Sequence, residues 1–175
     1  LIGGAESHSV PSAAARQLRR DLEQVAAACG VQDQVHFTGY LPGAEVSRLL
    51  QAADAAAFPF NAGVTRKSSS LLAALAAGLP VIATAPPGEV RGPIEAEGVL
   101  RVPPRDTAAL TGALDRVLFD RALAGRLAAA GRALAARHGW DAIAAVHAEV
   151  YARALTSRRG GESWTGAAEP SKVGP

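Results

Sequence analysis

Short apolar runs alternate with amphipathic helical patterns along most of the chain. The apolar runs predict strands at residues 1–4, 35–38, 55–60, 80–84 and 99–102. Between these runs, apolar residues recur every three or four positions, as they do along one face of a helix. Strands that alternate with helices in this way are typical of an α/β domain built on a parallel sheet.

The predicted helices have recognisable ends. In the first helix, which starts at Ser12, the apolar stripe runs from Leu18 to Cys29, and Gly30 supplies the stop. Asp106 is a predicted N-cap for the helix that follows the last strand. Further helices are predicted at residues 46–53, 68–77, 122–137 and 140–155. The Pro- and Gly-rich residues 85–97 predict a loop with little regular structure.

The composition indicates one globular domain. The chain has 175 residues, of which 49% are hydrophobic, and this is enough for a sizeable core. After residue 156 the chain is rich in Gly, Ser, Pro and charged residues, so we expect residues 157–175 to form a disordered tail. Because the chain has no methionine and opens on an apolar run, we expect it to be an N-terminally truncated piece of a longer protein.

Charge and cysteine content argue against several classes of site. The formal net charge is +2 and aromatic residues make up 5% of the chain, which argues against a nucleic-acid surface. Cys29 is the only cysteine, so no internal disulfide can form, and no Cys/His spacing predicts a metal site. The longest apolar stretch, residues 71–85, is shorter than the roughly 20 residues of a membrane span. We therefore expect a cytoplasmic protein without a transmembrane segment; the alternative location is the inner face of the membrane.

The segment between the third predicted strand and the next helix has more residues typical of a ligand-binding site than any other connection. In a parallel sheet, ligands bind beyond the carboxyl ends of the strands, where this segment lies. Its sequence, NAGVTRKSSS, puts Arg66 and Lys67 just before a helix, where a cation costs roughly 0.3–1 kcal/mol. An anion reverses that cost, because free backbone N–H groups, the helix dipole and the two cations all favour a phosphate.

We therefore predict that this segment binds phosphate. Gly63 would let the backbone approach the ligand closely. The hydroxyl groups of Ser68, Ser69 and Ser70 would bind phosphate oxygens. In the alternative interpretation, the serines only cap the helix and the two cations are solvated.

The order of four segments resembles the nucleotide-sugar-binding half of retaining glycosyltransferases of family four, which have the two-domain GT-B fold. The segments are VHFTGYLPGAEVSRLLQAADAAAFPF, LLAALAAGLPVIAT, GVLRVPPRDTAALTGALDRVL and HGWDAIAAVHAEVY. The resemblance covers nearly all of residues 1–155. It implies a Rossmann-like three-layer sandwich, the C-terminal half of a GT-B fold, in which residues 1–156 bind a UDP- or GDP-sugar without a metal or another cofactor.

The resemblance also implies roles for individual residues. The nucleobase would lie against Gly39, Tyr40 and Leu41. The diphosphate would lie against the segment that contains Gly63, Val64, Ser68, Ser69 and Ser70. Thr65 would lie near the sugar, with Arg66 and Lys67 stabilising the leaving phosphate, and these three are the predicted catalytic residues. Glu89 and Arg91 would contact the donor, with an ordinary surface role as the alternative. Trp140 would pack at the start of the last helix.

The sequence departs from the common pattern of this family at two positions. Typical members carry a glutamate that contacts the donor sugar and a second that holds the ribose hydroxyls. Counting back from Gly78, these positions fall on Thr65 and Ala73. A variant branch has a basic pair followed by small residues, similar to residues 66–69.

The predicted function is therefore donor binding within a retaining glycosyltransferase. The acceptor would be bound by an N-terminal domain that this chain lacks, so the chain alone would be inactive. Two alternatives are a non-catalytic nucleotide- or anion-binding module and a purely structural α/β partner.

Overall fold

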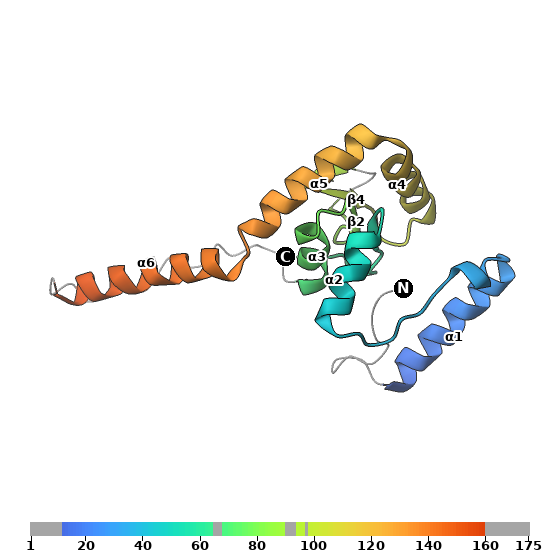
Figure 1. The fold of residues 1–175 in the computed structure, drawn as a ribbon, viewed down its shortest axis with the longest axis horizontal. Helices are drawn as coiled ribbons and strands as arrows, with labels where there is room; N and C mark the ends of the chain where they lie inside the picture. The colour runs from blue at the N-terminus through green and yellow to red at the C-terminus, as the bar shows by residue number, and fades with distance from the viewer. Residues whose placement is uncertain (1–11, 65–67, 90–93, 97, 160–175) are drawn as a thin grey trace.

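The computed structural model describes residues 12–64, 68–89, 94–96 and 98–159, which form a small sheet with helices around it (Figure 1). The helices are α1 (Ser12–Ala28), α2 (Gly43–Ala52), α3 (Ser69–Ala76), α4 (Thr107–Phe119), α5 (Arg121–Ala136) and α6 (Trp140–Arg159), with a 3-10 helix η1 at Gln32–Gln34. The strands are β1 (Ala56–Phe58), β2 (Val81–Thr84), β3 (Ile94–Ala96) and β4 (Val99–Val102).

The sheet has the strand order β1-β2-β4-β3. The pairs β1–β2 and β2–β4 are parallel, which confirms the predicted α/β class. β3 pairs antiparallel with β4, with Ala96 opposite Val99. The prediction of a loop over residues 85–97 therefore missed β3. An antiparallel neighbour needs only a tight connection, so a strand this short leaves little pattern in the sequence.

Helices cover both faces of the sheet, which confirms the predicted three layers. The cluster on the α3 face consists of Leu71, Ala74, Leu75, Leu79, Val81, Ala83, Val99 and Leu134. The cluster on the α4 face consists of Ile82, Leu100, Val102, Ala113, Val117, Leu123 and Leu127. Neighbouring residues of β2 and β4 join different clusters because successive side chains of a strand point to opposite faces. α5 contributes leucines to both clusters.

The predicted helix ends are confirmed by their hydrogen bonds. The Asp106 carboxylate accepts a hydrogen bond from the Ala109 N–H at 2.8 Å and so caps α4. Gly30 has a φ of +69°, and the Val31 N–H donates to the Ala26 carbonyl at 2.9 Å. This is the Schellman arrangement, in which a left-handed glycine ends a helix.

The predicted strand at residues 35–38 is wrong. These residues form an extended connection between η1 and α2, and within the described ranges none of them is part of a strand. Their described neighbour is α1, where the Arg19 guanidinium lies 5.0 Å from the centre of the Phe37 ring. A strand forms only where another strand accepts its backbone hydrogen bonds. The predicted strand at residues 1–4 lies outside the described residues.

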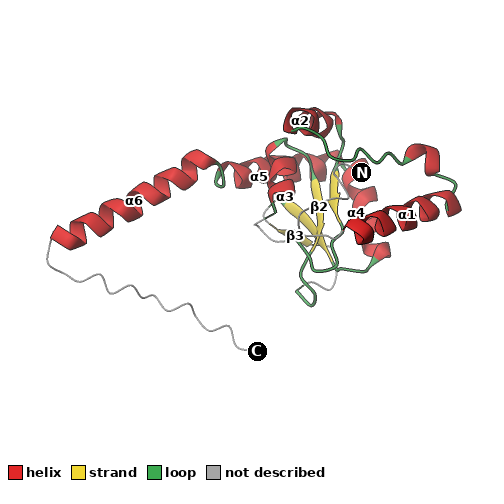
Figure 2. Ribbon diagram, turned by 90° about the horizontal axis from the view of Figure 1, so that it is seen from below, coloured by secondary structure: helices red, strands yellow, loops and turns green. Residues whose placement is uncertain are grey.

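The last helix extends away from the sheet in both views (Figures 1 and 2). α6 runs to Arg159, past the predicted end at residue 155, so the expected tail begins no earlier than residue 160. Residues 160–175 lie outside the described residues. Trp140 was expected to pack, but its side chain is 85% exposed. None of the helices in the described ranges is long and apolar enough to cross a membrane.

Candidate functional site

The connections that leave the carboxyl ends of β1, β2 and β4 are tied together by backbone hydrogen bonds. The Val64 N–H donates to the Thr84 carbonyl at 2.9 Å, which fastens the connection after β1 to the end of β2. The Ala85 N–H donates to the Val102 carbonyl, also at 2.9 Å, and so fastens the connection after β2 to β4. These hydrogen bonds therefore connect the edge at which open parallel sheets bind ligands. We call the connected residues, Val64, Thr84, Ala85 and Val102 with the neighbouring Gly63, the platform.

Thr84 forms a buried polar contact at the centre of this platform. Its side chain is 5% exposed, and its hydroxyl lies 2.6 Å from the Phe60 carbonyl and 3.2 Å from the Phe58 carbonyl, to which it can donate. A buried hydroxyl needs such a partner, so Thr84 fixes the path of the chain as it leaves β1. Along the sequence, Thr84 is recognisable only as the end of a predicted strand.

Gly63 is held at a position that only glycine fits. Its φ is +77°, and a Cβ atom built there would lie 2.5 Å from the Pro86 nitrogen and 2.7 Å from the Ala85 carbonyl oxygen. The close approach predicted for this residue is therefore made to the backbone of the connection after β2. Contact of Gly63 with a phosphate stays a prediction.

Ser68 caps α3, and two further serines open the helix. The Ser68 hydroxyl oxygen accepts a hydrogen bond from the Leu71 N–H at 3.3 Å, so its own proton can be donated elsewhere. Ser69 and Ser70 are exposed, and the N–H groups of a first helical turn have no acceptor within the helix. These groups can therefore bind an anion at the start of α3.

The central part of the predicted site lies outside the described residues. Thr65, Arg66 and Lys67 belong to this part, between Val64 and Ser68. Val64 is half-buried against the core cluster on the α3 face, and its N–H is already used by Thr84. Val64 therefore anchors the loop and has no backbone N–H left to offer a phosphate.

Glu89 lies in a tight turn after β2 and forms an ion pair with β4. The Glu89 N–H donates to the Pro86 carbonyl at 3.1 Å, and Gly88 has a φ of +83°. The Glu89 carboxylate lies 3.1 Å from the Arg101 guanidinium. Sequence reasoning selected Glu89 but missed Arg101, whose partner is apparent only once β4 is placed. Arg91 lies outside the described residues.

The predicted nucleobase turn precedes α2. Gly39 has a φ of +66°, the Tyr40 side chain is 85% exposed, and Leu41 is half-buried. α2 has ten residues and is therefore about 15 Å long, at 1.5 Å per residue. The turn lies before its first residue, and β1 follows its other end. The exposed Tyr40 ring is available for stacking, and its role toward a base stays a prediction.

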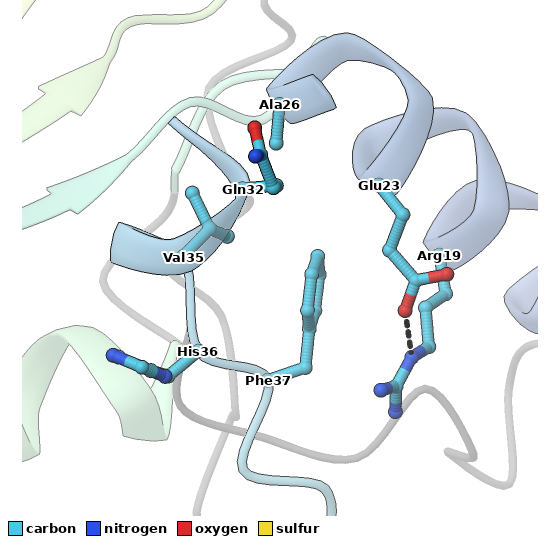
Figure 3. Close-up of a pocket in the computed structure, with 7 residues that line it drawn as sticks. All are labelled: Arg19, Glu23, Ala26, Gln32, Val35, His36 and Phe37. Carbon is cyan, nitrogen blue, oxygen red and sulfur yellow. Dashed lines mark hydrogen bonds and ion pairs between the residues drawn. The ribbon is translucent and has the colours of Figure 1, made fainter. Parts of the chain in front are cut away.

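A separate pocket of about 300 Å³ lies between α1 and the connection that precedes α2 (Figure 3). It is lined by Arg19, Glu23, Ala26, Gln32, Val35, His36 and Phe37. Figure 3 marks the ion pair of 2.8 Å between Arg19 and Glu23 at its rim. The pocket shares no residue with the predicted donor site. Within the part of the chain that the structure describes, no group of three His, Cys, Asp or Glu residues could hold a metal ion.

Comparison with known proteins indicates the family. The model of the family described as "Glycosyl transferases group 1" matches residues 6–120. The chain is 36% identical over 163 residues to a D-inositol 3-phosphate glycosyltransferase from Xylanimonas cellulosilytica, covering 91% of this chain and 36% of the relative. It is 32% identical to a phosphatidyl-myo-inositol mannosyltransferase from Mycobacterium leprae, covering 79% of this chain and 37% of the relative.

A solved structure supports the same class of fold. The sucrose-phosphate synthase of Thermosynechococcus elongatus is similar with a TM-score of 0.68 and 29% sequence identity, over 89% of this chain and 38% of that one. The chain thus spans a little over a third of the length of the relatives described above. The fold expected from the resemblance to GT-B enzymes is confirmed.

Proposed function

The chain belongs to the group 1 glycosyl transferases, and we propose that it is the part of such an enzyme that binds the nucleotide-sugar donor. In the proposed reaction, a sugar moves from a nucleoside diphosphate to an acceptor with retention at the anomeric carbon. The acceptor would be bound by a further domain of the parent enzyme. Two relatives carry names of sugar-transferring enzymes that act on inositol compounds, which supports transfer but leaves this chain's acceptor open.

The observation that carries the proposal is the platform at the carboxyl edge of the sheet. Gly63 and Val64 fix the first half of the connection after β1, and Ser68 fixes the second half by capping α3. The basic pair at residues 66–67 belongs to the same connection. A pyrophosphate at the start of α3 would meet serine hydroxyls, free N–H groups and two cations together.

This arrangement would assist the chemical step by electrostatics. When the bond between the sugar and the nucleotide breaks, negative charge develops on the leaving diphosphate. Donors that are fixed before the reaction stabilise this charge without the cost of reorganising solvent. Arg66, Lys67 and the N-terminus of α3 would be these donors, with Thr65 near the sugar.

A second function is favoured by one position on α3. Ala73 occupies the site where the resemblance predicts a ribose-binding glutamate, and it is exposed on the helix surface. Its methyl group can accept no hydrogen bond from a ribose. A module that binds a nucleotide or another anion without transferring a sugar is therefore the alternative, and measuring donor hydrolysis by the parent enzyme would separate the two functions.

Charge reversal tests the proposed phosphate site. Calorimetric titration with UDP, GDP and their sugars should give binding for at least one nucleotide. The double substitution Arg66→Glu and Lys67→Glu should weaken that binding by more than about tenfold, or about 1.4 kcal/mol. The matched control reverses Arg19 and Arg20, an adjacent basic pair on α1, and should leave affinity unchanged.

Two results would count against the proposed site. Unchanged affinity after reversal at residues 66 and 67 would exclude the phosphate assignment. An equal loss in the α1 control would show a general effect of net charge and exclude a local site.

A further inference from the structure

Arg101 leaves the sheet on the side of α3, close to the carboxyl edge. It precedes the last residue of β4, and in the register it stands beside Ala83 of β2, which stands beside Phe58 of β1. Ala83 belongs to the core cluster beneath α3, and Phe58 packs against that cluster. Residues side by side in register share a face of the sheet. The Arg101 side chain therefore lies on the face whose edge carries the start of α3.

The Arg101 side chain is only partly exposed to solvent, and its guanidinium forms an ion pair with Glu89. Its side chain is 21% exposed, against 48% for Glu89, and their charged groups are 3.1 Å apart. A charge on a partly shielded side chain is stabilised by a partner, whereas a half-exposed carboxylate can also accept hydrogen bonds from a ligand on its solvent side. Glu89 is therefore the member of the pair that can reach a ligand.

The backbone of Glu89 is also held by a hydrogen bond, within a tight turn. The sequence Pro87-Gly88 is the one that type II turns favour, and the hydrogen bond between Glu89 and Pro86 closes the turn. The first residues of this connection, Ala85 and Pro86, are those on which Gly63 rests. The carboxylate is thus connected through short contacts to the segment that precedes the basic pair.

We propose that Arg101 is a positioning residue, which holds the Glu89 carboxylate so that it accepts hydrogen bonds from hydroxyl groups of the donor sugar. Hydroxyl groups are the donors that a sugar presents, and a carboxylate is an acceptor for them. Thr65, at the position where the resemblance predicts a sugar-contacting glutamate, has no carboxylate, so Glu89 would supply the acidic group from another connection. This inference rests on the proposed donor-binding function.

The test separates binding of the sugar from binding of the nucleotide. The protein and its Arg101→Met variant are titrated with UDP and UDP-glucose, and with GDP and GDP-mannose. For the pair that binds, the variant should bind the nucleotide sugar about tenfold more weakly, since hydrogen bonds to charged groups are the strong ones. Its affinity for the free diphosphate should change less than about twofold, because the start of α3 is untouched.

Further variants check that Arg101 acts through Glu89. Arg101→Lys keeps the positive charge and should recover most of the sugar-dependent affinity. Glu89→Gln should reproduce the loss seen with Arg101→Met, and the double variant should be no weaker than either single one, because the two residues act as a unit. Arg19→Met, which removes the exposed ion pair with Glu23 on α1, is the matched control and should bind both ligands normally.

The outcomes distinguish this inference from the proposed function. If Arg101→Met weakens the free diphosphate and the nucleotide sugar equally, or weakens neither, the positioning role is wrong and donor binding stands. If the unsubstituted protein binds none of the four compounds, both are wrong. Unfolding midpoints of all variants, measured in parallel, identify any loss of affinity that comes from loss of the fold.

Discussion

Two regions of the molecule differ in whether their apolar side chains are buried. One region is the sheet with α3, α4 and α5, and the other consists of the outer helices α1 and α6. In the sheet and the helices α3, α4 and α5, leucines such as Leu75 and Leu123 are fully buried. In α1 and α6 the corresponding side chains face solvent, with Leu18 60% and Leu155 62% exposed. Figure 1 shows the same contrast, because α1 and α6 extend from the body in different directions.

The contrast shows what hydrophobic periodicity predicts and what it does not. The same spacing of apolar residues predicted α1 and the packed helices, and all of them formed. Each packed helix has at least one short connection to a neighbouring strand or packed helix, and this connection brings it onto the sheet. α1 is followed by residues 35–38, which pair with no strand in the described structure. Periodicity therefore identifies a helix and its apolar face, whereas the burial of that face depends on strand pairing elsewhere.

Two leucine substitutions should show the largest difference in stability between the packed region and the outer helices. Leu127→Ala in α5 removes a side chain that is 2% exposed and should lower the free energy of unfolding by about 2–5 kcal/mol. Leu155→Ala in α6 makes the same chemical change on an exposed surface and should cost less than about 0.5 kcal/mol. Urea unfolding, followed by far-ultraviolet circular dichroism, measures both. Equal costs would mean that α6 is packed as firmly as α5.

Two glycine substitutions compare the stability cost of an added Cβ atom at the platform with the cost at the end of α1. Gly63 and Gly30 both have positive φ, but a Cβ atom at Gly30 would meet nothing within 4 Å. Gly30→Ala should therefore cost only the left-handed backbone, about 1–2 kcal/mol. Gly63→Ala should cost about 1–3 kcal/mol more, because the added atom forces two connections apart.

The same variants have a functional readout. Gly63→Ala should also reduce nucleotide binding in calorimetry, since it moves the segment before the basic pair. Gly30→Ala should leave binding intact. Loss of binding in both variants would contradict a local role for Gly63.

Most of the central fold could be predicted because its signals are local. The strand at residues 99–102 was predicted with the bounds that it has, and the Asp106 cap was identified from the residue type before a helical pattern. The strand at residues 35–38 was wrong because its formation depends on a partner elsewhere in the chain. β3 was missed because three residues in a Pro- and Gly-rich stretch carry no periodic signal.

The candidate site could be predicted only in part, for a related reason. The positive charge before α3 is visible along the sequence, and so is the Ser68 cap that the structure confirms. Thr84 and Arg101 were missed because their partners lie 24 and 12 positions away, at Phe60 and Glu89. Such pairs come together only through the register of β2 with its neighbours. The roles of residues 65–67 remain predictions.

Removing the acidic residue at the start of a helix should lower the free energy of unfolding by less than the leucine or glycine substitutions in the packed region do. The effect should again be larger in the packed region than in α6. The Asp120 carboxylate accepts a hydrogen bond from the Leu123 N–H at 2.9 Å and starts α5, which packs on both core clusters. Asp120→Ala should therefore lower the free energy of unfolding by about 1 kcal/mol, and Asp120→Asn should restore most of it. Asp141→Ala in the first turn of α6 should change it by less, about 0.3 kcal/mol. A larger cost at Asp141 would show that α6 folds together with the sheet.

Removing one carboxylate from each of two ion pairs should have a small effect on stability and is the most informative about the site. Glu23→Gln breaks an exposed pair on α1 and should change the free energy of unfolding by less than about 0.5 kcal/mol. Glu89→Gln removes one carboxylate partner of an arginine whose side chain is less exposed than that of Arg19, so about 1 kcal/mol is expected, with less dependence on salt. Urea unfolding at low and high salt measures both. A cost of several kcal/mol at Glu89 would make the pair a structural element, whereas a small cost together with weaker sugar binding means that it acts on the ligand.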